Sequence, residues 1–427
     1  MSTSEIYLTD EEIADFIRET KISPQGTYGD EGAEYGVCPF ISFYVYHHDE
    51  DFLPIAAKMI QIYEKLKGFI DFPFQMELKN ATETWFKVGD KRLPTDLYAE
   101  AEKAFDKGPV YWLQATDMES PAASALWAIN ASVYVNSSMR YSTLKITYHY
   151  QWYLQNKAQW HSFVEDCLRA LEPEQCYSSF EIGTTTGGYG GAYESDVMER
   201  ICADYFYGLD VDHPSNMGFQ YHRDEDGWVN QSDFSAGIRT PTWCFLLSPI
   251  WLTKLGMDEA GVRQALNDPR IKISSLPRTD GGVNLWIQLG ELSLYPVEEG
   301  VPPLPVLASK LIKPIRCDKL ELTSLAPWDD DPNPRFDMLT SVQWMQRFDE
   351  NSLWPTAAIR QTPTAPHSPP VPPKHRVEGN HPCPADGYYI TPAKVQSRTY
   401  FKRGDLMPEY GNEIWQTIWQ WDINQEN

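Results

Sequence analysis

Residues 271–289 read IKISSLPRTDGGVNLWIQL and contain two strand patterns on either side of a turn. Asp280 and the two glycines after it separate the strands predicted over residues 271–276 and 283–289, and Asp-Gly is a strong hairpin signal. In the second strand every other residue is aliphatic, as in a strand with one buried face. These aliphatic residues are Val283, Leu285, Ile287 and Leu289. The stretch therefore predicts an antiparallel hairpin whose second strand is half-buried.

Two units of strand and helix precede this hairpin. Residues 40–46 are rich in β-branched and aromatic residues, and residues 52–69 carry apolar side chains at helical spacing. A second strand pattern, residues 143–149, is followed by a helix whose apolar face runs from Trp160 to Leu171. Each unit predicts a strand and then an amphipathic helix, and their similarity leaves open two related halves.

The remaining elements are mixed without strict alternation of strand and helix. Thr9 and Glu12 form a capping-box pattern, which predicts a short helix through about Thr20. Further strands are expected over residues 112–116 and 126–135, and further helices over residues 196–207 and 258–267. This order favours an α+β fold with mixed, mostly antiparallel sheets and packed amphipathic helices.

Composition divides the chain into four parts. Residues 1–36 hold the first helix and an acidic, Gly-rich loop, and residues 37–324 form the main α+β domain. Residues 325–382 are expected to be an acidic and Pro-rich linker, because prolines recur between residues 361 and 374. Residues 383–427 are rich in Tyr and Trp and predict a small β-rich module.

The chain is strongly acidic. Its 36 Lys and Arg stand against 60 Asp and Glu, so the formal net charge is −24. Such a charge repels nucleic acids and anionic membranes and attracts basic proteins. We therefore expect a basic protein partner and no direct binding to nucleic acid or membrane. A charge that only keeps the protein soluble is an equally good explanation of this feature alone.

The sequence also bears on location and on cofactors. Its amino terminus is acidic and lacks a signal-peptide pattern, and no apolar run reaches the ~18 residues that cross a bilayer. A cytoplasmic location is predicted. The seven cysteines are scattered without a C-x-x-C pair, so neither a disulfide framework nor a zinc site is indicated. No cofactor is expected.

Three acidic clusters are candidates for contact with a partner. Two of them stand beside a tryptophan, and an aromatic ring surrounded by carboxylates suits a basic protein surface. Exposed loops without a binding role are the alternative. The candidate partner-binding residues are Asp49, Glu50, Asp51, Asp224, Glu225, Asp226, Trp228, Trp328, Asp329, Asp330 and Asp331.

No motif provides a starting point for catalysis. The Gly-rich residues 184–191 lack the lysine of a phosphate-binding loop. His47 and His48 adjoin acidic residues, but adjacent strand residues point to opposite faces and do not converge on one ion. The common hydrolase and metalloprotease motifs do not occur. We therefore predict a protein without catalytic residues.

One set of residues in the second half of the chain carries a family resemblance. It consists of Gly237, Ile238, Arg239, Thr240, Pro241, Thr242, Trp243, Phe245, Leu246, Leu252, Leu255, Gly256, Gly282, Val283, Leu289, Gly290, Glu291, Leu304 and Pro305. On these residues, the segment 234–320 resembles the bacterial type VI secretion immunity proteins. A looser similarity covers about residues 37–320. The aromatic tail, residues 383–427, is similar to a module that recurs in proteins tied to these secretion loci.

The resemblance implies that the chain binds and neutralises a cognate antibacterial effector. It carries over no catalytic residues, and most matching residues are better explained as scaffold. The acidic charge and the expected encounter in the cytoplasm favour a nuclease as the effector. The chain is then expected to occlude the active or DNA-binding cleft of that nuclease. Two alternatives stay open: an adaptor or chaperone that loads an effector, and a hydrolase that reverses toxin damage.

Overall fold

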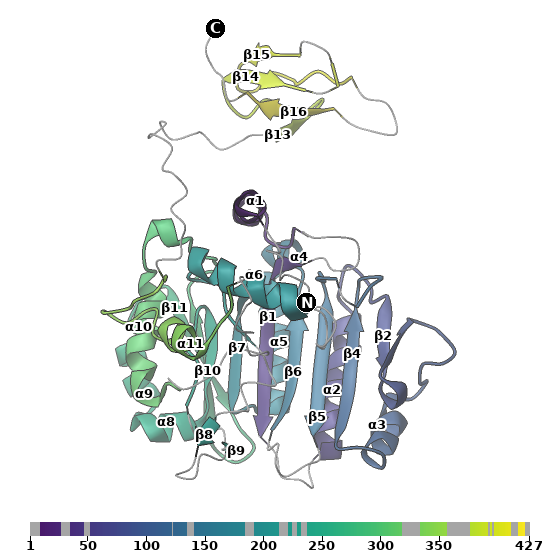
Figure 1. The fold of residues 1–427 in the computed structure, drawn as a ribbon, viewed down its shortest axis with the longest axis vertical. Helices are drawn as coiled ribbons and strands as arrows, with labels where there is room; N and C mark the ends of the chain where they lie inside the picture. Colours follow the sequence, from purple (N-terminus) through teal and green to yellow (C-terminus); the bar gives the residue numbers. More distant parts are fainter. Residues whose placement is uncertain are drawn as a thin grey trace, which may run out of the picture. The chain divides into compact units, whose positions relative to one another are not determined.

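The computed structural model describes residues 9–26, 35–46, 52–121, 123–134, 141–183, 192–212, 221–223, 229–231, 237–317, 334–356, 376–391, 393–394, 397–410 and 417–422. The chain forms two compact units, Met1–Ile359 and Arg360–Asn427. Each unit has a hydrophobic core of its own. The first unit is a large sheet with helices on both faces (Figure 1).

The sheet of the first unit has ten strands and is antiparallel throughout. Their order is β11-β12-β10-β7-β1-β6-β5-β4-β2-β3, so β1 lies between two strands that come much later in the chain. The strands are β1 (Gly36–Tyr46), β2 (Met76–Lys79), β3 (Thr84–Lys87), β4 (Val110–Thr116), β5 (Ala128–Tyr134), β6 (Tyr141–Thr147), β7 (Gln175–Gly183), β10 (Cys244–Leu247), β11 (Ile271–Pro277) and β12 (Val283–Leu289). A separate hairpin joins β8 (Tyr221–Arg223) and β9 (Val229–Gln231).

Helices cover both faces of this sheet. In Figure 1, α2 and α5 lie behind it, and α6 and α11 lie in front. The helices are α1 (Asp10–Ile22), α2 (Phe52–Lys67), α3 (Leu97–Phe105), α4 (Tyr150–Gln155), α5 (Lys157–Leu171), α6 (Ala192–Tyr205), α8 (Pro249–Leu255), α9 (Glu259–Ala265), α10 (Pro303–Ile312) and α11 (Met338–Met345). The predicted α+β class with antiparallel sheets is confirmed.

Local sequence signals explain the best-predicted helices. At the start of α1, Thr9 Oγ1 accepts a hydrogen bond from the Glu12 backbone N–H at 3.3 Å, and Thr9 N donates to Glu12 Oε2 at 2.7 Å. This is the capping box that the sequence predicts. In α5 the buried side chains run from Trp160 to Leu171 at three- and four-residue spacing, as predicted.

The hairpin over residues 271–289 forms, but β12 is not half-buried. Its polar and aromatic residues Asn284, Trp286 and Gln288 are 1%, 6% and 7% exposed. The reason is that β12 pairs with β11 on one side and β10 on the other, and α10 packs against it. At this end of the sheet the edge strand is β11, and β12 is an inner strand.

The first unit also includes residues 334–356, which belong to the segment expected to be a linker. Asp337 caps α11 by accepting from the Thr340 backbone N–H at 2.7 Å. Trp344 and Phe336 are buried in the main core. Apolar burial outweighs the acidic and Pro-rich composition here, so the structure differs from the expected linker over these residues. The Pro-rich tract, residues 361–374, lies outside the described residues.

The second unit is the small β-rich module that the tail composition predicts. Its four strands are antiparallel and have the order β13-β16-β14-β15. They are β13 (Arg376–Glu378), β14 (Gly387–Ile390), β15 (Thr399–Phe401) and β16 (Ile418–Trp421). Tyr389, Phe401 and Trp419 form most of its core.

Candidate functional site

One face of the large sheet is polar at its centre. Side chains alternate along β1, so Ser42 and Tyr44 lie on the face opposite Ile41 and Phe43. Ser42 pairs directly with Lys145 on β6, which places the lysine on the same face. Ser42 and Tyr44 are 0% exposed and the Lys145 side chain is 15% exposed, so this face is covered rather than open to solvent. We call this buried group the charged layer; its members are Tyr44, Lys145, Glu181, Asp210, Asp212 and Arg239.

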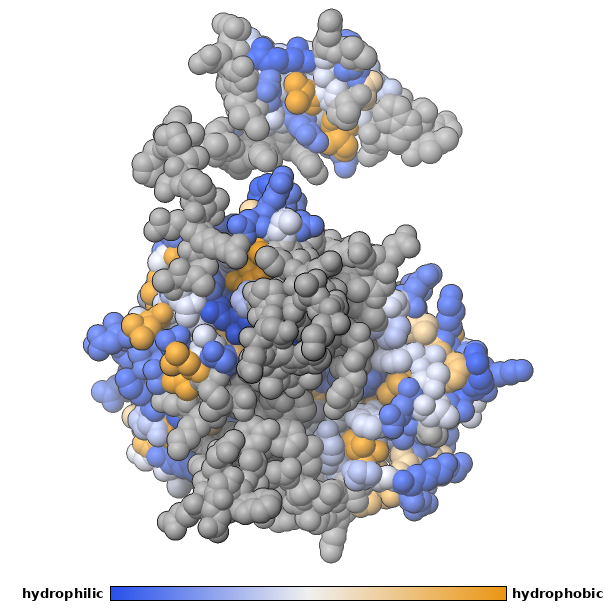
Figure 2. All heavy atoms as spheres, in the orientation of Figure 1, coloured by the Kyte–Doolittle hydropathy of each residue, from blue (hydrophilic) through white to orange (hydrophobic). Residues whose placement is uncertain are grey.

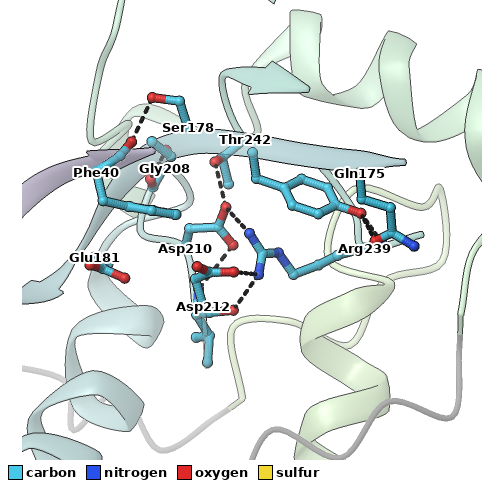
Figure 3. Close-up of polar contacts among 12 residues, drawn as sticks. Phe40, Gln175, Ser178, Glu181, Gly208, Asp210, Asp212, Arg239 and Thr242 are labelled. Carbon is cyan, nitrogen blue, oxygen red and sulfur yellow. Dashed lines mark hydrogen bonds and ion pairs between the residues drawn. The ribbon is translucent and has the colours of Figure 1, made fainter. Parts of the chain in front are cut away.

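Arg239 lies at the centre of the charged layer, between two aspartates (Figure 3). Its Nη2 donates to Asp210 Oδ2 at 3.1 Å, and its Nη1 donates to Asp212 Oδ1 and to the Val211 carbonyl oxygen. The guanidinium carbon lies 4.2 Å from the centroid of the Tyr177 ring. One arginine thus holds residues 210–212 and strand β7 together.

Asp212 connects the arginine to the two central strands. The Tyr44 hydroxyl on β1 donates to Asp212 Oδ1 at 2.6 Å. Lys145 Nζ on β6 donates to the Asp212 carbonyl oxygen at 2.9 Å and forms an ion pair with Glu181 on β7 at 2.5 Å. Three adjacent strands and two connecting segments therefore meet in one network.

Burial and charge act in opposite directions on the pKa values of these groups. Burial alone would raise the pKa of Asp212, but the charges of Arg239 and Lys145 outweigh it and lower that pKa. Burial raises the pKa of Glu181 to about 8, although Lys145 offsets part of the effect. For Arg239, burial disfavours the charged form, and Asp210 and Asp212 more than compensate, so its pKa is raised. The pair of Arg239 and Asp212 is therefore charged at neutral pH.

The backbone before Arg239 explains why a glycine stands at position 237. Gly237 has a φ of 147°, and a Cβ there would lie 2.5 Å from the backbone nitrogen of Cys317. The adjacent Ile238 N donates to the Ile315 carbonyl oxygen at 2.9 Å, and Cys317 N donates to the Ile238 carbonyl oxygen at 3.0 Å. This close pairing fixes the point from which Arg239 enters the charged layer.

The thiols of the first unit are not placed for reaction. All seven cysteines of the chain are buried. Burial raises the pKa of the thiols of Cys38, Cys167, Cys176, Cys202 and Cys244, and the thiolate is the reactive form. Within the described ranges, no three His, Cys, Asp or Glu side chains are grouped so that they could hold a metal ion.

A second polar cluster lies nearer the surface, where β5 begins. Asp71 Oδ1 accepts from Trp127 Nε1 at 2.6 Å, and Asp71 Oδ2 contacts His149 Nδ1 at 2.8 Å. The Phe72 ring stands edge-on to His149 and is 46% exposed. Nearby, burial raises the pKa of Asp117 to about 6, while backbone N–H groups that include that of Trp127 lower it in part. An exposed ring beside carboxylates is the chemistry expected of a contact with a basic protein.

The predicted partner-binding residues all lie outside the described residues. These are Asp49, Glu50, Asp51, Asp224, Glu225, Asp226, Trp228, Trp328, Asp329, Asp330 and Asp331. Described elements flank two of the clusters: residues 49–51 connect β1 to α2, and residues 224–228 connect β8 to β9. Their role in binding stays a prediction.

Sequence reasoning missed the charged layer except for Arg239. Asp210 and Asp212 precede Arg239 by 29 and 27 residues and follow no recognisable motif. The available signal was Lys145, a charged residue inside a predicted strand whose neighbours are apolar. A lysine in such a position requires a buried carboxylate, but the sequence does not say which one.

Comparison with known proteins gives a family and a fold. Residues 84–348, more than half of the chain, match the family described as type VI immunity for VRR-NUC. Among solved structures, the chain is similar to the Pseudomonas aeruginosa T6SS protein PA0821, with a TM-score of 0.62 and 18% identity over 80% of this chain and 92% of that one. At this identity the likeness shows a shared fold. No curated protein matches the sequence.

The matched region contains Lys145, Glu181, Asp210, Asp212 and Arg239 of the charged layer, whereas Tyr44 lies before it in the chain. It also contains the hairpin of β11 and β12. Among the helices that the structure describes, none has the length and apolar character needed to span a membrane.

Proposed function

The chain belongs to the family of type VI immunity proteins for VRR-NUC, and from this premise we propose that it neutralises its nuclease effector by binding it directly. The observation that carries the proposal is the distribution of negative charge along the chain. Residues 360–427 contain 7 Lys and Arg and 7 Asp and Glu, so the net charge of −24 belongs entirely to residues 1–359. The acidic part of the chain is thus the part that includes the family match.

Charge complementarity supports a nuclease surface as the target of this unit. An enzyme that cleaves DNA binds a polyanion and therefore presents a positively charged groove. A strongly acidic inhibitor is attracted to that groove and competes there with DNA. We therefore propose that the chain occludes the active or DNA-binding cleft of the effector. The acidic clusters at residues 49–51, 224–226 and 329–331 remain candidates for this contact.

The visible surface suits polar recognition. In Figure 2, the described hydrophobic residues form small, separate patches among hydrophilic ones. A large apolar patch would favour a permanent hydrophobic interface, whereas small patches between charged groups fit a partner that is met in solution. This arrangement supports fast, charge-guided association with the effector.

We propose further that inhibition is stoichiometric and not catalytic. In the charged layer each strong charge is engaged by an opposite one, and the layer is buried. Groups that are buried and engaged with one another in this way are not available to a substrate. The proposed place of action is the cytoplasm, because the DNA that a nuclease effector attacks is there.

A nuclease assay tests direct inhibition. The purified chain is titrated into the purified effector, and cleavage of duplex DNA is followed. We expect cleavage to stop near one equivalent of the chain. We also expect the association rate to fall as salt rises from about 50 to 500 mM, because screening shortens the range of attraction. Full inhibition by a small fraction of one equivalent would indicate catalysis and contradict the proposal.

A further inference from the structure

A groove opens at one end of the large sheet, between α3 and the first half of β4. Strand β2 pairs with β4 only at Met76 with Thr116 and at Glu77 with Ala115, and the chain then turns away in a short 3-10 helix, Asn80–Thr82. The Asn80 Oδ1 accepts from the Trp112 backbone N–H at 2.8 Å, where a further strand residue would otherwise bind. The sheet therefore splits here, and a groove of about 460 Å³ remains beside Trp112.

The groove combines an apolar floor with a negatively charged rim. Its apolar lining includes Ala104, Val110 and the half-buried Trp112. Its charged lining consists of Glu83, Asp96, Glu100, Lys103 and Lys107. Three carboxylates against two amines leave the lining net negative. A concave surface with an aromatic wall and a few polar groups is typical of the centre of a protein interface.

Glu100 is a carboxylate of this groove that burial affects and that no cation of the described residues contacts closely. It is half-buried on α3, and burial raises its pKa, an effect that Lys79 and the backbone N–H of Asn80 only partly offset. Within the part of the chain that the structure describes, Glu100 forms no ion pair closer than 4 Å. A cation that entered the groove would compensate a charge that has already lost much of its water.

Resting on the proposed function, we propose that this groove receives a Lys or Arg side chain of the VRR-NUC effector. The aliphatic stem of that side chain lies against Trp112 and Ala104, and its charged head pairs with Glu100. Long basic side chains combine these two kinds of contact well. The choice of occupant follows from charge complementarity, because the groove is net negative in a strongly acidic unit and a DNA-binding enzyme is rich in basic side chains.

The test compares matched substitutions on α3. Glu100→Lys reverses the charge in the groove, and Ala99→Trp fills the groove without changing charge, because Ala99 also lines it. Glu102→Lys is the control, since Glu102 is exposed on the same helix and does not line the groove. The dissociation constant of each full-length variant for the effector is measured by calorimetry, and folding is checked by circular dichroism and thermal melting.

We expect Glu100→Lys and Ala99→Trp each to raise the dissociation constant at least about tenfold, and Glu102→Lys less than about threefold. If Glu100→Lys melts early, the shape-preserving Glu100→Gln replaces it, with the same direction expected. Equal effects of Glu100→Lys and Glu102→Lys, or unchanged binding by Ala99→Trp, would overturn the groove proposal while the immunity function stands. If the unchanged chain does not bind the effector, the proposed function itself fails.

Discussion

Arg239 and Asp212 form an ion pair in which both side chains are completely buried. Asp212 accepts a second hydrogen bond from Tyr44, and Arg239 binds a second carboxylate, Asp210. The pair therefore belongs to a network whose members come from five separate segments of the chain. Its integrity depends on all of them being in place, so we expect the loss of one partner to destabilise the fold.

Arg239→Met tests this dependence. Removing one partner leaves Asp210 and Asp212 as buried, uncompensated charges, so we expect a loss of roughly 3–5 kcal/mol in the free energy of unfolding. The measurement is urea denaturation followed by Trp fluorescence. Arg169→Ala is the control, because Arg169 pairs with Glu165 on the exposed face of α5 and its loss costs about 0.5 kcal/mol or less. Similar losses for both variants would contradict the central role of the network.

Tyr44→Phe isolates a single hydrogen bond to a charged group. The Tyr44 hydroxyl donates to Asp212, and such a bond contributes about 1.5–3 kcal/mol. We expect the free energy of unfolding to fall by this amount. Tyr153→Phe is a matched control, because the buried Tyr153 hydroxyl has no hydrogen-bond partner among the described residues. Its removal is expected to be neutral or stabilising, and a loss there as large as that of Tyr44→Phe would mean that the effect of Tyr44→Phe does not report its hydrogen bond.

Asp117→Asn tests a pH dependence. The folded pKa of Asp117, about 6, lies above the ordinary value of 3.8, because the buried carboxyl resists ionisation. As pH rises through this interval the unfolded chain ionises first, so the wild type loses stability, by roughly 3 kcal/mol at most above pH 7. Asparagine cannot ionise and avoids that loss.

We therefore expect Asp117→Asn to unfold at higher urea concentration than the wild type at pH 8 and at about the same concentration at pH 4. The readout is the difference in unfolding free energy between the two proteins at each pH. A gain of equal size at both pH values would mean that the substitution acts through shape and not through the charge of Asp117.

Truncation after residue 359 tests which unit carries immunity. The two units have separate hydrophobic cores, and the acidic excess lies in the first. We expect residues 1–359 alone to melt within a few degrees of the first transition of the full chain, and to protect cells that express the effector. Loss of protection by a truncated chain that is still folded would favour the adaptor role considered for the aromatic module.

Local features of the chain were determined by the sequence alone. The capping box of Thr9 and Glu12 starts α1 because both partners are three residues apart. The face of α5 from Trp160 to Leu171 follows from helical spacing. The hairpin of β11 and β12 follows from the Asp-Gly turn. The family resemblance around Arg239 was also legible, because it rests on residues that are close together in the chain.

Only the tertiary structure decided which side chains from different elements meet, and where the groove lies. Only the strand order, with β1 between β6 and β7, brings Tyr44 and Lys145 to the carboxylates that they bind. The same order places β12 between β10 and β11, where α10 packs against it, and the split between β2 and β4 opens the groove beside Glu100. The physical reason is that periodicity shows which side of an element is buried, whereas the partner of a buried charge depends on contacts between segments far apart in sequence.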